Sequence, residues 1–111
     1  MSHYVPDRGD VVWLNFTPQS GHEQAGKRPA FVISPAVYNK KVGLALFCPI
    51  TSQVKGYPFE VPVPDAHGIH GVILSDQLKS LDWNARNAKF IAKLPSQTTE
   101  EVIRKVTTLI Q

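Results

Sequence analysis

The chain has 111 residues, 42% of them hydrophobic and 19% charged, a composition that suits one folded domain and excludes a disordered chain. By itself, the formal net charge of +3 is too small to indicate that the protein binds nucleic acid. A single cysteine excludes an internal disulfide. No apolar run approaches the roughly 20 residues of a membrane span, and no apolar secretory segment follows the first residues. We expect one cytoplasmic domain over residues 1–111, without a membrane partner.

Six short apolar segments, rich in β-branched and aromatic residues and separated by glycine and proline, are expected to be strands. They span residues 11–16, 30–33, 44–48, 59–63, 71–74 and 88–92. Trp13 and Cys48 are expected in the core, and Pro62 predicts an edge strand because proline cannot donate to a neighbour. Many short strands in a small domain favour a small barrel or a strongly bent sheet, since closure removes exposed edges.

The C-terminal segment changes to helical spacing. Its apolar positions are Val102, Ile103, Val106, Leu109 and Ile110. Thr98 and Glu101 have the spacing of a capping box, which predicts the start of the helix. We expect this helix to cover one face of the sheet. The predicted fold class is therefore mainly β with α: a small barrel followed by a C-terminal helix.

A polar segment, HEQAGKRP over residues 22–29, precedes the strand predicted at 30–33. Glycines on either side predict that Glu23 lies on a loop and Arg28 at the mouth of the strand, so both side chains could face one cleft. A carboxylate can accept a proton and a guanidinium can hold a phosphate, which together suit phosphodiester transesterification. The alternative is a loop salt bridge between Glu23 and Lys27 or Arg28.

Two further polar clusters follow predicted strands, at residues 51–53 and 75–79. Hydroxyls at a strand end can donate to phosphoryl oxygens, and the alternative for the first cluster is turn chemistry. The alternative for the second cluster is a short helical turn capped by Ser75 or Asp76.

Asp65, His67 and His70 lie close together but lack the second cluster that a zinc site normally shows. We therefore expect neither a metal nor a cofactor. The sequence also has no phosphate-cradling glycine loop and no Gly-x-Ser-x-Gly motif, which argues against nucleotide hydrolysis and acyl transfer.

Ordered sequence blocks along nearly the whole chain carry a family resemblance. They are YVPDRGDVVW at 4–13, EQAGKRPA at 23–30, VISP at 32–35, PITS at 49–52, KGYPFEV at 55–61 and SDQLKS at 75–80. With these blocks the chain resembles the MazF/PemK family of type II toxin–antitoxin toxins. The resemblance implies an SH3-like β-barrel that forms a homodimer and acts as a metal-independent endoribonuclease, or mRNA interferase, on short motifs in single-stranded RNA.

The resemblance also implies roles for particular residues. Glu23, Arg28 and Thr51 match the catalytic positions, and the 2′-hydroxyl of RNA would attack to leave a 2′,3′-cyclic phosphate and a 5′-hydroxyl. Some members have histidine where this chain has Lys27, so protonation of the leaving oxygen falls to Arg28, Lys27 or water. The expected RNA-binding residues are Lys27, Ser52, Gln53, Lys55, Tyr57, Asp76, Gln77 and Lys79.

The implied partners are single-stranded RNA, whose phosphates would lie along the basic window from Lys27 to Lys55, and a cognate antitoxin whose acidic, disordered tail would occupy the same window. Tyr57 and Phe59 suit a core as well as a groove. Two other functions stay open, because fold alone does not fix function. One is a non-catalytic toxin of the gyrase-poison type, and the other is a nucleic-acid-binding barrel without catalysis.

Overall fold

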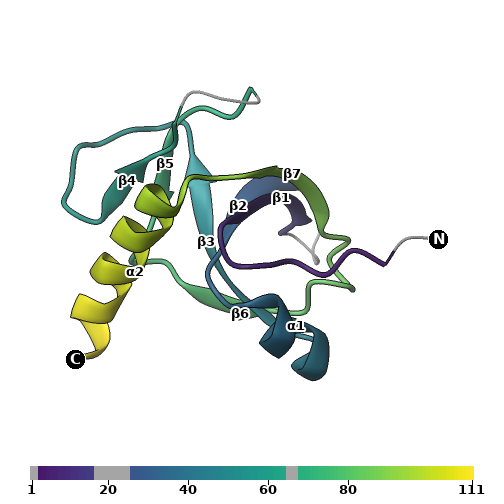
Figure 1. Ribbon diagram of the computed structural model, residues 1–111. Coiled ribbons are helices and arrows are strands. Elements are labelled where there is room, and N and C mark those ends of the chain that lie inside the picture. Colours follow the sequence, from purple (N-terminus) through teal and green to yellow (C-terminus); the bar gives the residue numbers. More distant parts are fainter. Residues whose placement is uncertain (1–2, 17–25, 65–67) are drawn as a thin grey trace.

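The computed structural model describes residues 3–16, 26–64 and 68–111 of the chain. Within these ranges seven strands form one antiparallel sheet, accompanied by two helices (Figure 1). The strands are β1 (Asp10–Asn15), β2 (Lys27–Val32), β3 (Ala45–Thr51), β4 (Glu60–Pro62), β5 (Val72–Leu74), β6 (Lys79–Leu81) and β7 (Lys89–Lys93). The helices are α1 (Ala36–Val42) and α2 (Ser96–Ile110).

The strands pair in the order β4-β5-β3-β2-β1-β7, and β6 also pairs with β3. β3 is the central strand: its first residues pair with β6, its middle with β2, and Ile50 and Thr51 with β5. All six expected strands are present within a few residues of the predicted bounds, and β6 was not predicted. Pro62 lies in β4 at one end of the sheet, as expected. The mainly β fold with a C-terminal helix is confirmed.

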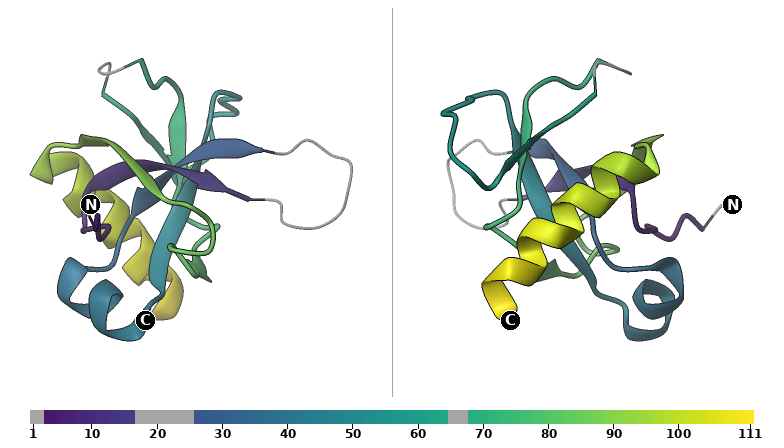
Figure 2. Two further views of the ribbon diagram at one scale, coloured as in Figure 1. Left: turned by 90° about the vertical axis from the view of Figure 1, so that its right-hand side faces the viewer. Right: turned by 60° about the vertical axis from the view of Figure 1, so that its left-hand side comes forward.

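Two clusters of buried side chains hold the fold together. One joins the sheet to α2 and includes Phe31, Cys48 and Val102, and Figure 2 shows α2 crossing this side of the sheet. The other includes Val12 and Leu14. Burial, with a smaller contribution from the charge of Asp76, raises the pKa of the Cys48 thiol to about 12.

Trp13 was expected in the core, and that prediction is wrong because its side chain is 37% exposed. Side chains alternate between the two faces of a strand. Val12 and Leu14 are fully buried in one cluster, so Trp13 points to the opposite face, where it lines a pocket.

The predicted capping box at the start of α2 is also wrong. The helix begins at Ser96, after Pro95, and no side chain caps it. The backbone N–H groups of Thr98 and Thr99 both donate to the carbonyl of Pro95, at 3.0 and 3.2 Å. Because the Pro95 carbonyl accepts these first bonds, α2 starts at Ser96, before the expected position.

The short helix α1 was not predicted from the sequence. Asn39, fully buried, donates through Nδ2 to the carbonyl oxygens of Pro6 and Ser34 at 2.7 and 2.9 Å. The Trp83 indole N–H donates to the Asn39 carbonyl at 3.0 Å. These bonds tie α1 to distant parts of the chain. In the described ranges, neither helix is long and apolar enough to cross a membrane.

Candidate functional site

An open pocket of about 420 Å³ lies where β1, β2, the end of β3 and the chain before β5 meet; we call it the Arg28 pocket. It is lined by Trp13, Arg28, Pro29, Ile50, Thr51, Ser52, Gln53, Gly68, Ile69 and His70. A smaller pocket of about 130 Å³, the Tyr57 pocket, is lined by Thr51, Gln53, Lys55, Tyr57, Glu60, Leu74 and Gln77. Thr51 and Gln53 line both pockets, so the two are neighbours, and together we call them the Thr51 groove.

Arg28 is the second residue of β2 and pairs with Leu14 of β1. Leu14 is fully buried, so the backbone that carries Arg28 is anchored to the core while the guanidinium group stays exposed. Arg28 makes no salt bridge to any other residue that the structure describes. Within the described ranges, no acidic side chain competes with an anion in the Arg28 pocket for this charge. Glu23, its predicted partner or cocatalyst, lies outside the described residues.

Thr51 is the last residue of β3 and pairs with Val72 of β5. Its Oγ1 accepts a hydrogen bond from the backbone N–H of Gln53 at 3.1 Å, so the turn chemistry considered as an alternative is present. A hydroxyl has one hydrogen and two acceptor lone pairs. The bond from Gln53 occupies an acceptor position and leaves the hydroxyl hydrogen for donation to an oxygen in the groove.

Gly71 packs directly against the backbone of Thr51. A Cβ atom at this position would lie 2.0 Å from the Thr51 carbonyl oxygen and 2.9 Å from the Ser52 Cα, and its φ of +123° is rarely adopted by other residues. Only glycine permits this close approach. The chain before β5 thus supports the position of Thr51.

The Tyr57 pocket is bounded by a hydrogen bond between two predicted RNA-binding residues. The Tyr57 hydroxyl donates to Asp76 Oδ1 at 2.7 Å. This hydrogen bond is the main cause that raises the pKa of Tyr57 to about 12, so the phenol remains protonated at neutral pH. The turn that carries Asp76 starts at Ser75, whose buried hydroxyl donates to the Phe59 carbonyl. It leads into β6, not into the helical turn considered as an alternative.

The structure brings most of the predicted site residues together. Those that line the Thr51 groove are Arg28, Thr51, Ser52, Gln53, Lys55, Tyr57 and Gln77. Asp76 reaches the groove through its bond to Tyr57, whereas Lys27 and Lys79 are exposed but line neither pocket. Sequence reasoning missed Trp13, Ile69 and Gly71. Of these three, only Gly71 could have been identified from the sequence, because a glycine inside a predicted strand often marks a close approach of two backbone segments.

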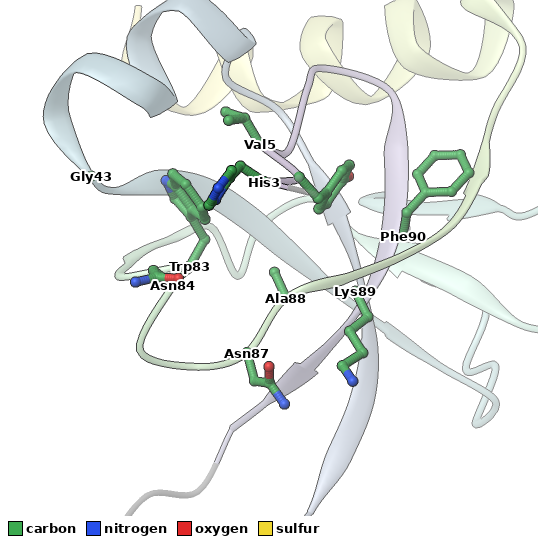
Figure 3. Close-up of a pocket in the computed structure, with 10 residues that line it drawn as sticks. His3, Val5, Gly43, Trp83, Asn84, Asn87, Ala88, Lys89 and Phe90 are labelled. Carbon is green, nitrogen blue, oxygen red and sulfur yellow. The ribbon is translucent and has the colours of Figure 1, made fainter. Parts of the chain in front are cut away.

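A larger pocket of about 780 Å³ lies elsewhere, between the N-terminal segment and the chain leading into β7 (Figure 3). Aromatic side chains dominate it, including Trp83 and Phe90, and the Phe90 ring meets that of Tyr4 edge to face at 5.8 Å between centroids. Its lining includes Lys89 but no arginine and no serine or threonine, and the Tyr4 hydroxyl donates to Asp10, so it is a poorer phosphate site than the Arg28 pocket. Of the three residues weighed as metal ligands, Asp65 and His67 lie outside the described ranges.

In the part of the chain that the structure describes, no group of three or more His, Cys, Asp or Glu side chains could hold a metal ion. The polar groups that line the Thr51 groove are the Arg28 guanidinium, hydroxyls, amides, the Lys55 ammonium group, the His70 imidazole and the Glu60 carboxylate.

The antiparallel sheet and the C-terminal helix α2 define a small, mainly β domain that carries the Thr51 groove on one side of the sheet's central strand. Residues 7–110 match the family described as PemK-like, MazF-like toxin of type II toxin-antitoxin system, and the chain belongs to this family. The predicted family and toxin class are thereby confirmed.

Relatives support the assignment over the full length. The chain is 46% identical over 110 residues to the endoribonuclease toxin MazF of Escherichia coli (strain K12), covering 99% of this chain and 98% of that protein. The endoribonuclease toxin ChpB of the same organism is 36% identical, covering 95% of this chain and 94% of that protein. A crystal structure of MazE-MazF (Form-II) from Deinococcus radiodurans has a TM-score of 0.92 and 54% identity, covering 97% of each chain.

Proposed function

We propose that this MazF-type toxin is an endoribonuclease that cleaves single-stranded RNA by attack of the RNA's own 2′-hydroxyl on the adjacent phosphate. The observation that carries the proposal is the meeting of Arg28 and Thr51 in one open pocket, with the Thr51 hydroxyl oriented by Gln53. The relatives named as endoribonucleases, which match the chain over nearly its full length, support the activity.

The proposed reaction needs charge stabilisation more than covalent chemistry from the protein. Arg28 binds the non-bridging oxygens of the scissile phosphate through two parallel N–H groups, and the Thr51 hydroxyl donates to the same oxygens. Glu23 accepts the proton of the 2′-hydroxyl. The 2′-oxygen forms a bond to phosphorus while the bond to the 5′-oxygen breaks, and Arg28, Lys27 or water protonates that oxygen. The products carry a 2′,3′-cyclic phosphate and a 5′-hydroxyl.

The rest of the groove is proposed to bind the RNA on either side of this phosphate. Lys55 and Tyr57 would contact the nucleotides that enter the Tyr57 pocket, where ring stacking suits any base. Polar contacts to base edges and phosphates are assigned to Ser52, Gln53, Asp76 and Gln77. Lys27 and Lys79, outside the pockets, would attract the backbone at longer range.

We also propose three properties of the assembly: a homodimer, a cytoplasmic location and a cognate antitoxin. The solved MazE-MazF complexes of Deinococcus radiodurans support an antitoxin partner for this chain. An acidic tail on that antitoxin would complement the cations of the groove and compete with RNA. Simultaneous binding of RNA and antitoxin at the groove, without competition, would contradict this part.

The deciding experiment incubates the purified protein with a synthetic single-stranded RNA in excess chelator and identifies the product ends. We expect cleavage with cyclic phosphate and 5′-hydroxyl termini. Thr51→Ala should slow cleavage, and Thr108→Ala, at an exposed position of α2, serves as the matched control. Binding of RNA without cleavage would favour a nucleic-acid-binding barrel, and neither binding nor cleavage would favour a toxin with another target.

A further inference from the structure

Glu60, the first residue of β4, is a buried acid with an unusual set of partners. Its Oε2 accepts a hydrogen bond from the backbone N–H of Lys55, and its Oε1 accepts one from that of Gly56, both at 2.9 Å. Hydrogen bonds to a carboxylate are about twice as strong as those between neutral groups, and burial makes their loss costly. The buried Glu60 carboxylate therefore fixes the segment 54–56 through two hydrogen bonds to its backbone.

The other end of this loop is held separately. Lys105 of α2 donates to the carbonyl oxygens of Pro58 and Glu60 at 2.6 and 3.2 Å, and Figure 1 shows α2 beside β4. Tyr57 is held by Asp76. Among the described residues, the hydrogen bonds that reach segment 54–56 are those from the backbone of Lys55 and Gly56 to Glu60, so Glu60 is the hydrogen-bonding partner that fixes this segment.

We propose that Glu60 is a positioning residue for RNA recognition, whose two hydrogen bonds fix segment 54–56 so that Lys55 faces the Tyr57 pocket. The inference rests on the proposed endoribonuclease function. Both carboxylate oxygens point to the loop, so Glu60 acts through the loop and not on the scissile phosphate. Its loss should weaken RNA binding while leaving the chemical step at Arg28 and Thr51 intact.

The first test is Glu60→Gln, which keeps the size of the side chain but replaces one acceptor oxygen with an NH2 group that cannot accept. Loss of a charge-assisted hydrogen bond predicts a KM for RNA raised about 10-fold, with kcat changed by less than about twofold. Glu100→Gln, at an exposed position of α2, is the matched control and should leave both constants unchanged. An unchanged KM, or a fall in kcat as large as the rise in KM, would overturn the proposal.

A double-mutant cycle asks whether Glu60 acts through Lys55. On a Lys55→Ala background, Glu60→Gln should raise KM much less than it does in the wild type, because the side chain being positioned is already gone. Fully additive effects would show that Glu60 contacts RNA independently, which contradicts the positioning role.

Amide hydrogen exchange of the wild-type protein tests the same contact even if Glu60→Gln does not fold. The amides of Lys55 and Gly56 should be protected in the absence of RNA, and exchange at the rate of an unstructured peptide would overturn the proposal. Failure of the wild type to cleave RNA would instead reject the proposed function. If the wild type cleaves and the amides are unprotected, only the role of Glu60 is rejected.

Discussion

The two halves of the Thr51 groove are supported in different ways. Arg28 and Thr51 stand on strands whose backbone pairing and buried neighbours fix them. Lys55 and Tyr57 stand on a loop that is held by hydrogen bonds to the side chains of Glu60, Asp76 and Lys105. The residues proposed for catalysis, whose side chains must be placed within fractions of an ångström, therefore lie on strands of the sheet. The residues proposed to recognise RNA lie on a loop, whose contacts can change without disturbing the sheet.

The largest effect is expected in the half supported by strands. Arg28→Ala removes the charge at the scissile phosphate and should lower kcat about 100- to 1,000-fold, measured in single-turnover cleavage. Arg28→Lys should recover only part of the rate, because an ammonium group cannot form two parallel bonds to a phosphate. Arg104→Ala, at an exposed position of α2, is the control. Near wild-type cleavage by Arg28→Ala would remove the assignment.

The second-largest loss of cleavage rate is expected for Gly71→Ala, because this substitution displaces Thr51 without removing any polar group. The added methyl would lie 2.0 Å from the Thr51 carbonyl oxygen, and the resulting shift should slow cleavage about 100-fold. Gly43→Ala is a close control for the backbone strain, since its φ is +83° with no atom within 4 Å of the added group. Equal rate losses in the two variants would show that strain alone, not displacement of Thr51, explains the effect.

The salt dependence of RNA binding tests the half supported by the loop. Binding of an uncleavable RNA should weaken as salt rises, and Lys55→Ala should reduce the slope of log affinity against log salt by about 0.7. Fluorescence anisotropy over a range of salt concentrations measures this slope. Lys89→Ala, in the larger pocket beside Trp83 and Phe90, should leave the slope unchanged. A Lys55→Ala protein with the wild-type slope would place Lys55 away from the phosphates.

The smallest effect is expected for Tyr57→Phe, which removes the hydrogen bond to Asp76 and keeps the ring. Loss of one exposed hydrogen bond predicts a rise in KM of about two- to tenfold with kcat unchanged. Because the pKa of Tyr57 is raised to about 12, the phenol keeps its proton, and this difference should not vary with pH near neutrality. A ratio of KM values that changed across neutral pH would contradict the assignment.

Much of the fold could be predicted from the sequence because local pattern and tertiary structure agree. The six apolar segments, the edge position of Pro62 and the C-terminal helix all follow from periodicity and proline chemistry. Helix α1 could not be predicted, because bonds from Asn39 to residues distant in the chain stabilise it. Trp13 was misplaced because an uninterrupted apolar segment does not show which side chain the fold leaves exposed.

The candidate site was predictable for a different reason. Arg28, Thr51 and Lys55 lie in ordered motifs, and the fold places Arg28 and Lys55 in two neighbouring pockets that share Thr51. Contacts that involve no distinctive side chain, such as the approach of Gly71 to Thr51, cannot be predicted from the sequence and become visible only in the structure. The role proposed for Glu60 could not be predicted either, since a glutamate in a predicted strand does not reveal that its partners are two backbone amides.

The buried thiol of Cys48 has a practical consequence for labelling experiments. It is the only cysteine in the chain, it is fully buried, and its pKa of about 12 keeps it in the unreactive thiol form. Maleimide reagents should therefore spare the native protein. A cysteine introduced at exposed Val54 would give a single attachment point for a fluorophore, so movement of the loop beside bound RNA could be followed without removing Cys48.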